Sequence, residues 1–214
     1  MQRLRVRFHR LKELKYISHL DIMRMWQRAF RRADITLAYS EGFNPQPRIS
    51  LAAPLAIGVT SQAELMDAYL GRWVSPHNLT VAVNRQLPPG IEILQVSPVP
   101  LTQPSLQSLV RFAEYTVEVA SQKDEQEVRQ ALDELLAKDK LPWQHQRDTG
   151  PRHYDLRRLV DGLSLAGCAE GRCVIDMRLR CDSSGSGRPE QVALALGFES
   201  PLSIHRTRLI LKAG

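Results

Sequence analysis

The sequence predicts an α+β protein made of two ferredoxin-like domains, each with the order β-α-β-β-α-β and an antiparallel sheet. Three observations lead to this prediction: stretches that alternate apolar and polar residues, stretches with helical periodicity, and a proline-rich break near the middle of the 214 residues. The break, 97–108, contains three prolines and no charged residue. It separates a predicted domain at 1–100 from a predicted domain at 108–214.

Each half contains six stretches in the predicted order. In the first half, strands are expected at 3–10, 48–58, 63–71 and 91–99, and helices at 18–33 and 75–87. In the second half, strands are expected at 113–120, 173–181 and 205–213, and helices at 124–138 and 188–197. The remaining strand of the second half falls in a less regular stretch, 152–167.

The first strand predicts a basic sheet face. Leu4, Val6 and Phe8 alternate with charged residues and would face the helices. The open face of the sheet would then carry Arg3, Arg5, Arg7 and His9. RNA-binding domains of this topology use that face, usually with aromatic residues that stack on bases. Because arginines stand here instead, contact with phosphates is favoured over base stacking.

The helix expected at 18–33 has the clearest start signal in the chain. Ser18 is a good N-cap, and Asp21 can complete a capping box. Its predicted buried stripe is Ile22, Trp26, Ala29, Phe30 and Ala33. On another side, four arginines share an arc of roughly 100°, namely Arg24, Arg28, Arg31 and Arg32. Such a run is either a solvated face or an anion site, and no acid within the arc relieves the repulsion.

The stretch AYSEGFNPQPRIS predicts a rigid loop after this helix. Gly42 permits a positive φ, while Pro45 and Pro47 fix φ and restrict the residues before them. Its two aromatics, Tyr39 and Phe43, either fill the core or offer a stacking surface. The predicted loop pocket is Tyr39, Ser40, Glu41, Gly42, Phe43, Asn44 and Pro45, with Arg48 at its exit. We expect it to lie near one end of the helix, beside His19 or beside Arg31 and Arg32.

The net charge of +6 is concentrated at the N-terminal end. Residues 1–100 hold 13 basic and 7 acidic residues, and residues 101–214 hold 16 of each. A localised basic surface binds polyanions by releasing counterions, so nucleic acid is a candidate partner. No apolar run approaches the roughly 18 residues of a membrane span, and the N-terminus has no signal-peptide pattern. We therefore expect a cytoplasmic protein that does not enter a membrane.

Few residues suggest chemistry. The three cysteines, Cys168, Cys173 and Cys181, lack zinc or cluster spacing. Strand alternation in CVIDMRLRC predicts that Cys173 and Cys181 are buried thiols. There is no phosphate loop or dinucleotide motif. His19, at the start of the first helix, is the single candidate for a catalytic base, and we predict no metal and no cofactor.

The run from residue 16 to residue 65 resembles a bacterial family of uncharacterised radical-SAM-linked proteins. It carries SHLD, R-x-x-R-R, AYSEGFNP-x-P and P-L-x-x-G-x-x-S-x-x-E, which are shared features of that family. The second half resembles it through YDLRRLV, GRPEQV and HRT, with Arg158 where the family tends to have proline. The resemblance implies an accessory role in RNA modification beside a radical SAM enzyme with a cobalamin-binding domain.

The sequence therefore favours a non-catalytic protein that binds RNA, either tRNA or rRNA, or presents a substrate to such an enzyme. Two alternatives stay open. One is a metal-independent ribonuclease on a similar tandem fold, with His19 as general base. The other is a module that only binds protein, in which the arginines meet an acidic partner.

Overall fold

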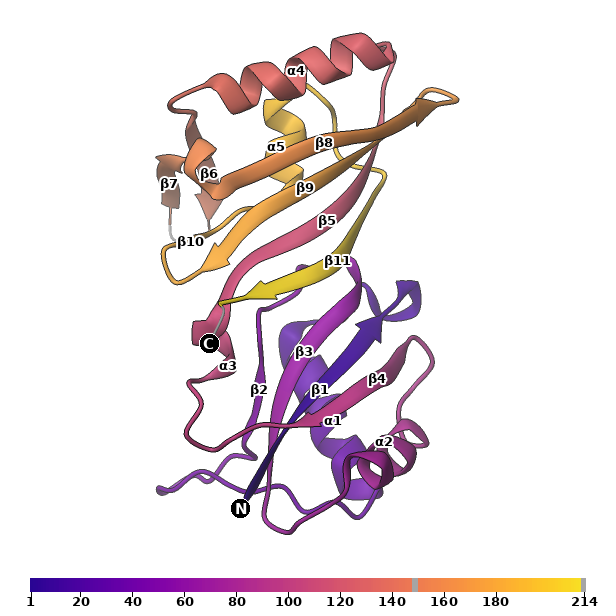
Figure 1. The fold of residues 1–214 in the computed structure, drawn as a ribbon, viewed down its shortest axis with the longest axis vertical. Helices are drawn as coiled ribbons and strands as arrows, with labels where there is room; N and C mark the ends of the chain where they lie inside the picture. The colour runs from indigo at the N-terminus through magenta and orange to yellow at the C-terminus, as the bar shows by residue number, and fades with distance from the viewer. Residues whose placement is uncertain (148–149, 213–214) are drawn as a thin grey trace. The chain divides into compact units, whose positions relative to one another are not determined.

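The computed structural model describes residues 1–147 and 150–212, and the chain divides into two compact units, Met1–Val110 and Arg111–Gly214 (Figure 1). We describe each unit by itself. Both mix helices with mostly antiparallel strands, which confirms the α+β class. The last residues of the predicted strand 205–213 and of the predicted domain 108–214 lie outside the described residues.

The first unit follows the predicted order of elements. They are β1 (Gln2–Arg10), α1 (His19–Arg32), β2 (Ile49–Leu51), β3 (Thr60–Leu70), α2 (Pro76–Asn84) and β4 (Ile91–Pro98). Two short helices are added, η1 (Lys12–Leu14) and α3 (Leu106–Leu109). Its strands are ordered β2-β3-β1-β4, and each neighbouring pair is antiparallel.

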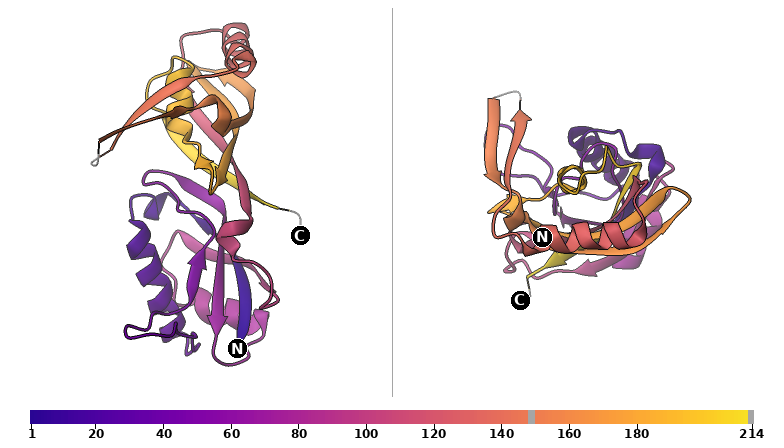
Figure 2. Two further views of the ribbon diagram at one scale, coloured as in Figure 1. Left: turned by 90° about the vertical axis from the view of Figure 1, so that its left-hand side faces the viewer. Right: turned by 90° about the horizontal axis from the view of Figure 1, so that it is seen from above.

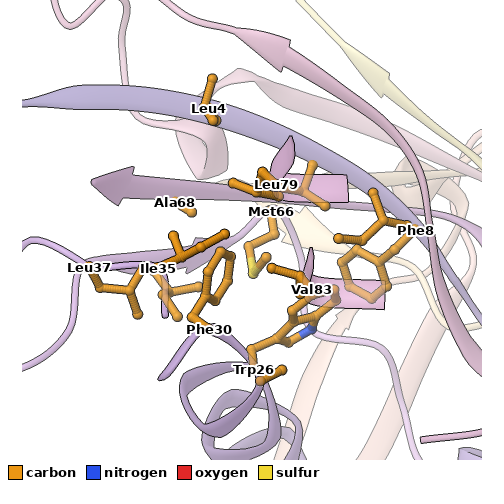
Figure 3. Packing of buried hydrophobic residues seen from close by; sticks show 14 of the residues in the cluster. Leu4, Phe8, Trp26, Phe30, Ile35, Leu37, Met66, Ala68, Leu79 and Val83 are labelled. Atoms are coloured by element: carbon orange, nitrogen blue, oxygen red, sulfur yellow. The ribbon is translucent and has the colours of Figure 1, made fainter. Parts of the chain in front are cut away.

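Helices α1 and α2 pack on one face of this sheet, because residues from both join the core formed by the inward side chains of β1 and β3 (Figure 3). Trp26 of α1 is completely buried and meets the ring of Phe8 edge-on, with centroids 4.9 Å apart. Leu79 and Val83 of α2 belong to the same buried cluster. The alternation of β1 thus sends Arg3, Arg5 and Arg7 to the opposite face.

Local signals set both ends of α1. The Ser18 hydroxyl accepts a hydrogen bond from the Asp21 backbone N–H at 3.2 Å, as the sequence predicts. At the other end, Asp34 has a positive φ of 56°. The Ile35 N–H then donates to the Phe30 carbonyl at 3.0 Å, and the Asp34 N–H to the Arg31 carbonyl at 3.2 Å. This Schellman-type cap reverses the chain and leads it back toward the edge of the sheet.

Two predictions for the first unit need correction. The strand expected at 48–58 is only three residues long, and most of the apolar run that follows β2 is irregular. The break expected at 97–108 is partly structured, since β4 reaches Pro98 and α3 buries Leu106. Apolar composition alone does not distinguish a strand from buried irregular chain, because only pairing with a neighbour makes the difference.

The second unit consists of a sheet, two helices and an additional hairpin. Its elements are β5 (Val110–Ala120), α4 (Glu125–Ala137), β6 (Pro142–Arg147), β7 (Gly150–Asp155), η2 (Arg157–Leu159), β8 (Val160–Ala169), β9 (Arg172–Asp182), β10 (Gly185–Ser186), α5 (Pro189–Ala195) and β11 (Ser203–Leu211). The strand order is β8-β9-β5-β11, with β10 also on β9. The pair β6–β7, which the sequence did not predict, stands out from the rest of the unit in Figure 2.

The cysteine prediction is partly wrong. Cys168 and Cys173 face each other across the β8–β9 hairpin and form a disulfide, with Cα atoms 4.1 Å apart. Cys173 is buried as expected, but it is not a thiol. Cys181 is not in a disulfide and is half-buried. Alternation along one strand could not reveal the bond, because Cys168 belongs to the neighbouring strand.

Candidate nucleic-acid interface

The predicted arginines of α1 lie on its solvent side. All four are exposed: Arg24, Arg28, Arg31 and Arg32. Arg24 has an acidic neighbour, because its Nη1 lies 3.3 Å from a carboxylate oxygen of Asp21 one turn away. The expectation that no acid relieves this face is therefore wrong at its N-terminal end. Such an exposed pair is worth little, so most of the positive charge of the face remains available.

Hydrogen bonds join the two ends of the predicted loop. We call it the 39–47 loop, since Tyr39 and Pro47 form an isolated antiparallel bridge. The Ser40 N–H donates to the Gln46 carbonyl at 2.9 Å, and the Gln46 N–H donates to the Ser40 hydroxyl at 3.0 Å. Gly42 has a φ of 118°, which confirms the need for glycine there. The loop thus has a fixed base and presents its tip to solvent.

Both aromatics of this loop face solvent. Phe43 is fully exposed and Tyr39 is 58% exposed. The alternative that they fill the core is therefore wrong. Exposing a Phe side chain forgoes roughly 1.5–3 kcal/mol of burial energy. A rigid loop that forgoes this energy offers a flat apolar surface suited to stacking.

The loop and the helix meet in one open pocket of about 550 Å³. Its lining residues come from α1, from the chain that follows it and from the 39–47 loop: Arg24, Gln27, Arg28, Arg31, Asp34, Ile35, Thr36, Leu37, Tyr39 and Pro47. Of the two helix ends considered, the loop lies by the Arg31 end. Arg32 and the predicted loop-pocket residues Ser40, Glu41, Gly42, Phe43, Asn44 and Pro45 do not line this pocket.

The lining of this pocket is strongly basic. Three guanidiniums face one carboxylate, that of Asp34. Arg31 and Arg32 also stand in the last turn of α1, where positive charge offsets the negative end of the helix dipole. Part of their role is therefore structural. Arg24 and Arg28 lie further from that end, so the dipole does not account for them.

The sheet face of β1 differs from the prediction. Arg3 is buried, and its Nε and Nη2 donate to the Asp67 carboxylate of β3 at 2.9 and 2.6 Å. Its other donors reach the carbonyls of Gln103 and Pro104. Arg5 donates to the same carboxylate at 2.8 Å. The prediction that Arg3 and Arg5 contact phosphate is therefore wrong, because Asp67 already occupies both.

The other predicted residues lie apart from the pocket. Arg7 is exposed on β1, and His9 lies 4.0 Å from Glu92. Arg48 stacks over the ring of Tyr69, 4.2 Å from its centroid, and does not line the pocket. His19 is exposed at the first residue of α1, whereas the pocket lies toward the opposite end.

Sequence reasoning missed several lining residues. Gln27 lies one residue before Arg28 on α1, and Asp34 and Thr36 follow the helix. The single signal was the position of Asp34 directly after the last helical turn, where a residue that tolerates positive φ is needed. In the described ranges, no group of three His, Cys, Asp or Glu side chains is arranged to hold a metal ion. No helix there is long and apolar enough to cross a membrane.

A family model described as an uncharacterised protein conserved in bacteria (DUF2344) matches residues 3–189. No curated protein matches the chain. Among solved structures, the chain is similar to the crystal structure of a Cbf5–Nop10–Gar1 complex, with 10% identity and a TM-score of 0.55. That match covers 96% of this chain and 48% of the other.

Two further solved structures match less well. The crystal structure of the archaeal box H/ACA sRNP Nop10–Cbf5 complex has a TM-score of 0.49 at 11% identity, over 97% of this chain and 48% of that one. The H/ACA RNP bound to a substrate RNA containing 2′-deoxyuridine has a TM-score of 0.48 at 12% identity, over 95% and 47%. The chain thus spans about half the length of the chains it matches. At such identities, the likeness to the first structure shows the fold alone.

Proposed function

We propose that this chain, which belongs to the family of uncharacterised proteins conserved in bacteria (DUF2344), binds single-stranded RNA without catalysing a reaction and presents it to a partner enzyme. The observation that carries the proposal is the juxtaposition of three exposed arginines of α1 with the 39–47 loop, whose Phe43 is fully exposed. Single strands are bound by this combination of positive charge along the backbone and aromatic rings that stack on bases.

Each part of the interface has a distinct chemical task. The guanidiniums of Arg24, Arg28 and Arg31 supply paired donors for phosphate oxygens. Tyr39 lines the pocket beside them, so a base that follows a bound phosphate meets an aromatic ring there. Phe43 at the loop tip offers a second ring. A duplex keeps its bases stacked on one another, so single strands gain more from these rings.

The resemblance to the radical-SAM-linked family supports a finer form of the proposal. In that form, the partner is a radical SAM enzyme with a cobalamin-binding domain, and the reaction is RNA modification in the cytoplasm. The partner would carry the iron–sulfur cluster, because two of this chain's three cysteines are joined in a disulfide. We also propose that the two units are tandem ferredoxin-like domains. The strand orders β2-β3-β1-β4 and β8-β9-β5-β11 support this, since each strand occupies the equivalent place.

The experiment is a fluorescence titration of labelled single-stranded RNA with the wild-type chain and with Phe43→Ala. We expect the variant to bind about tenfold more weakly, because one base–aromatic stack is worth roughly 1–3 kcal/mol. The matched control is Tyr16→Ala. Tyr16 is another exposed aromatic residue, 71% accessible, and it precedes the N-terminal end of α1. That variant should bind like wild type, and both should keep the wild-type melting temperature.

Three results would overturn the proposal. The wild-type chain could fail to bind RNA while binding an acidic peptide, which would favour the protein-interaction module. Both aromatic variants could bind equally well, which would remove Phe43 from the interface. Cleavage of the RNA in EDTA, abolished in His19→Ala, would favour the ribonuclease alternative, which the exposed position of His19 away from the pocket does not support.

A further inference from the structure

A second pocket lies within the other unit, between η2, the β6–β7 hairpin and the segment 184–188. Its volume is about 240 Å³, and its lining includes Tyr154, Asp155, Arg158, Ser184, Arg188 and Gln191. Apart from Ser184, these residues come from two of the segments singled out in the sequence, YDLRRLV and GRPEQV, neither of which takes part in the first pocket. The fold therefore unites two segments that lie about thirty residues apart in the chain.

The backbone at Gly187, next to the pocket-lining residue Arg188, is closely packed. A Cβ on Gly187 would lie 3.0 Å from both the Leu159 carbonyl oxygen and the Leu179 Cβ, a closer approach than most Cβ atoms make. The Gly187 N–H also donates to the Arg180 carbonyl at 2.8 Å. The backbone beside Arg188 is therefore closely packed against Leu159, the last residue of η2.

Positive charge dominates the lining. Arg152, Arg158 and Arg188 contribute three guanidiniums, and Asp155 is the one acid among the lining residues. Arg188 Nη1 lies 3.1 Å from Nε2 of His145, a contact that holds the guanidinium at the rim. The Tyr154 hydroxyl donates to the side-chain oxygen of buried Gln191, which orders the opposite wall. Such an arrangement of guanidiniums suits a phosphate group.

One carboxylate oxygen of Asp155, which lines the pocket, has no hydrogen-bond donor among the described residues. Asp155 Oδ1 accepts from the Leu141 and Arg157 N–H groups at 2.8 and 3.1 Å. Asp155 Oδ2 is buried, and no group among the described residues donates a hydrogen bond to it. Its nearest cation, Arg158 Nε, is 3.4 Å away and forms an ion pair only. A buried acceptor without a donor is costly, so a ligand hydroxyl at this place would be favoured.

We propose that this pocket binds a ribonucleoside phosphate. Its phosphate contacts Arg158 and Arg188, and a ribose hydroxyl donates to Asp155 Oδ2. The volume of about 240 Å³ lies below the roughly 300 Å³ at which small-molecule pockets usually begin, so a single nucleotide is the largest ligand that we assign to it. The nucleotide is either free or the phosphorylated end of an RNA. This site stands independently of the interface on α1, since it uses other residues of the other unit.

The test is equilibrium binding of adenosine 5′-monophosphate to the full chain. We expect saturable binding that falls about tenfold or more in Arg188→Gln, because hydrogen bonds to charged groups are the strong ones. The matched control is Arg129→Gln, which removes one exposed arginine of α4 that does not line the pocket. That control should bind like wild type, and Arg188 is exposed, so its replacement should leave the melting temperature unchanged.

A second ligand tests the hydroxyl contact. 2′,3′-Dideoxyadenosine 5′-monophosphate should bind to the wild-type chain about tenfold more weakly than the ribonucleotide does. Its affinity for Asp155→Asn should equal its affinity for the wild-type chain, because the hydroxyl contact is already missing from this compound. A 5′-phosphorylated RNA tetranucleotide that binds more tightly than the mononucleotide would identify an RNA end as the ligand, and the reverse order would identify a free nucleotide. Absence of saturable binding for all of these, equal binding of the dideoxy compound, or an equal loss in Arg129→Gln would overturn the proposal.

Discussion

Two sets of arginines in the first unit differ in what their guanidiniums contact. Arg3 and Arg5 of β1 both donate to the carboxylate of Asp67, whereas Arg28 and Arg31 of α1 are exposed and line an open pocket. Both sets repeat at the period of their element. The contrast teaches that periodicity places an arginine on a face, while the acid across from it decides whether its charge supports the fold or meets a ligand.

The β1 set has a further role that the helix set lacks. Arg3 donates to the carbonyls of Gln103 and Pro104, so it ties the chain after β4 back to the sheet. A buried cation of this kind is tolerated because all three of its nitrogens donate hydrogen bonds and the carboxylate supplies the opposite charge. Arg3 is therefore not available to a ligand, because its guanidinium contributes to the fold.

The largest effect should come from breaking the buried set. Asp67→Asn leaves Arg3 buried without its counter-charge, and we expect the free energy of unfolding to fall by about 3–5 kcal/mol. Denaturant unfolding measures this. The control is Glu92→Gln, which alters an exposed acid beside His9 and should cost less than about 0.5 kcal/mol. Equal stability of the two variants would show that the buried ion pairs contribute little.

The next effect concerns RNA affinity at rising salt. Replacing Arg28 and Arg31 together by glutamine should reduce the slope of log K against log salt by about 0.7 for each phosphate that the protein no longer neutralises. The free energy of unfolding should fall by no more than about 0.3–1 kcal/mol, the contribution of Arg31 at the negative end of the helix dipole, because both side chains are exposed. Arg7→Gln, on the exposed part of the sheet face, should leave the slope as it is. If Arg7→Gln reduces the slope as well, the contrast between the two faces does not hold.

A smaller gain is expected at the single acid of the α1 pocket. Asp34→Asn removes its negative charge, and we expect RNA binding to strengthen by about 0.5–1 kcal/mol, the size of a surface Coulomb interaction. Asparagine tolerates the left-handed backbone of this position, so the melting temperature should not change. The same titration measures the gain. Weaker binding would mean that Asp34 contacts the ligand through a hydrogen bond.

The smallest effect is a pH dependence in the second unit. Burial lowers the pKa of His205, so the fold favours the neutral ring. Above its ordinary pKa, near 6.5, both folded and unfolded states are neutral; as pH falls through that value, the unfolded state takes up the proton more readily and stability is lost. The loss should be well below about 1 kcal/mol, because the ring is partly solvated. His205→Gln should lack it in melts at pH 5 and pH 8.

Much of the secondary structure could be predicted from the sequence, since it depends on near neighbours. The start of α1 at the Ser18 cap and the alternation of β1 agree with prediction within one or two residues. The hairpin β6–β7 could not be predicted. Pro142–Arg147 and Gly150–Asp155 are rich in polar residues and lack an alternating apolar pattern. Their pairing with each other makes them strands.

The candidate interface was predictable in its parts but not in its assembly. Arginine spacing identified the α1 face, and glycine with two prolines identified the loop. The loop's contact with the Arg31 end depends on the Asp34 cap and on hydrogen bonds between Ala38 and Tyr69 and between Tyr69 and Arg48. Those bonds join residues about thirty or twenty positions apart in the chain. Pattern within a single element carries no information on such pairs.

By itself, the sequence determined most of the helices and strands outside the 48–58 run and the β6–β7 hairpin, the buried face of α1, and that the excess positive charge lies in the first half. These properties follow from covalent geometry, side-chain periodicity and composition. Only the tertiary structure decided that Asp67 neutralises Arg3 and Arg5, that Cys168 bonds Cys173, that Phe43 is exposed to solvent, and that Tyr39 lines an arginine-rich pocket. The physical reason is that a charge, a thiol or a ring takes its role from the group that packing places opposite it, which is often distant in the chain.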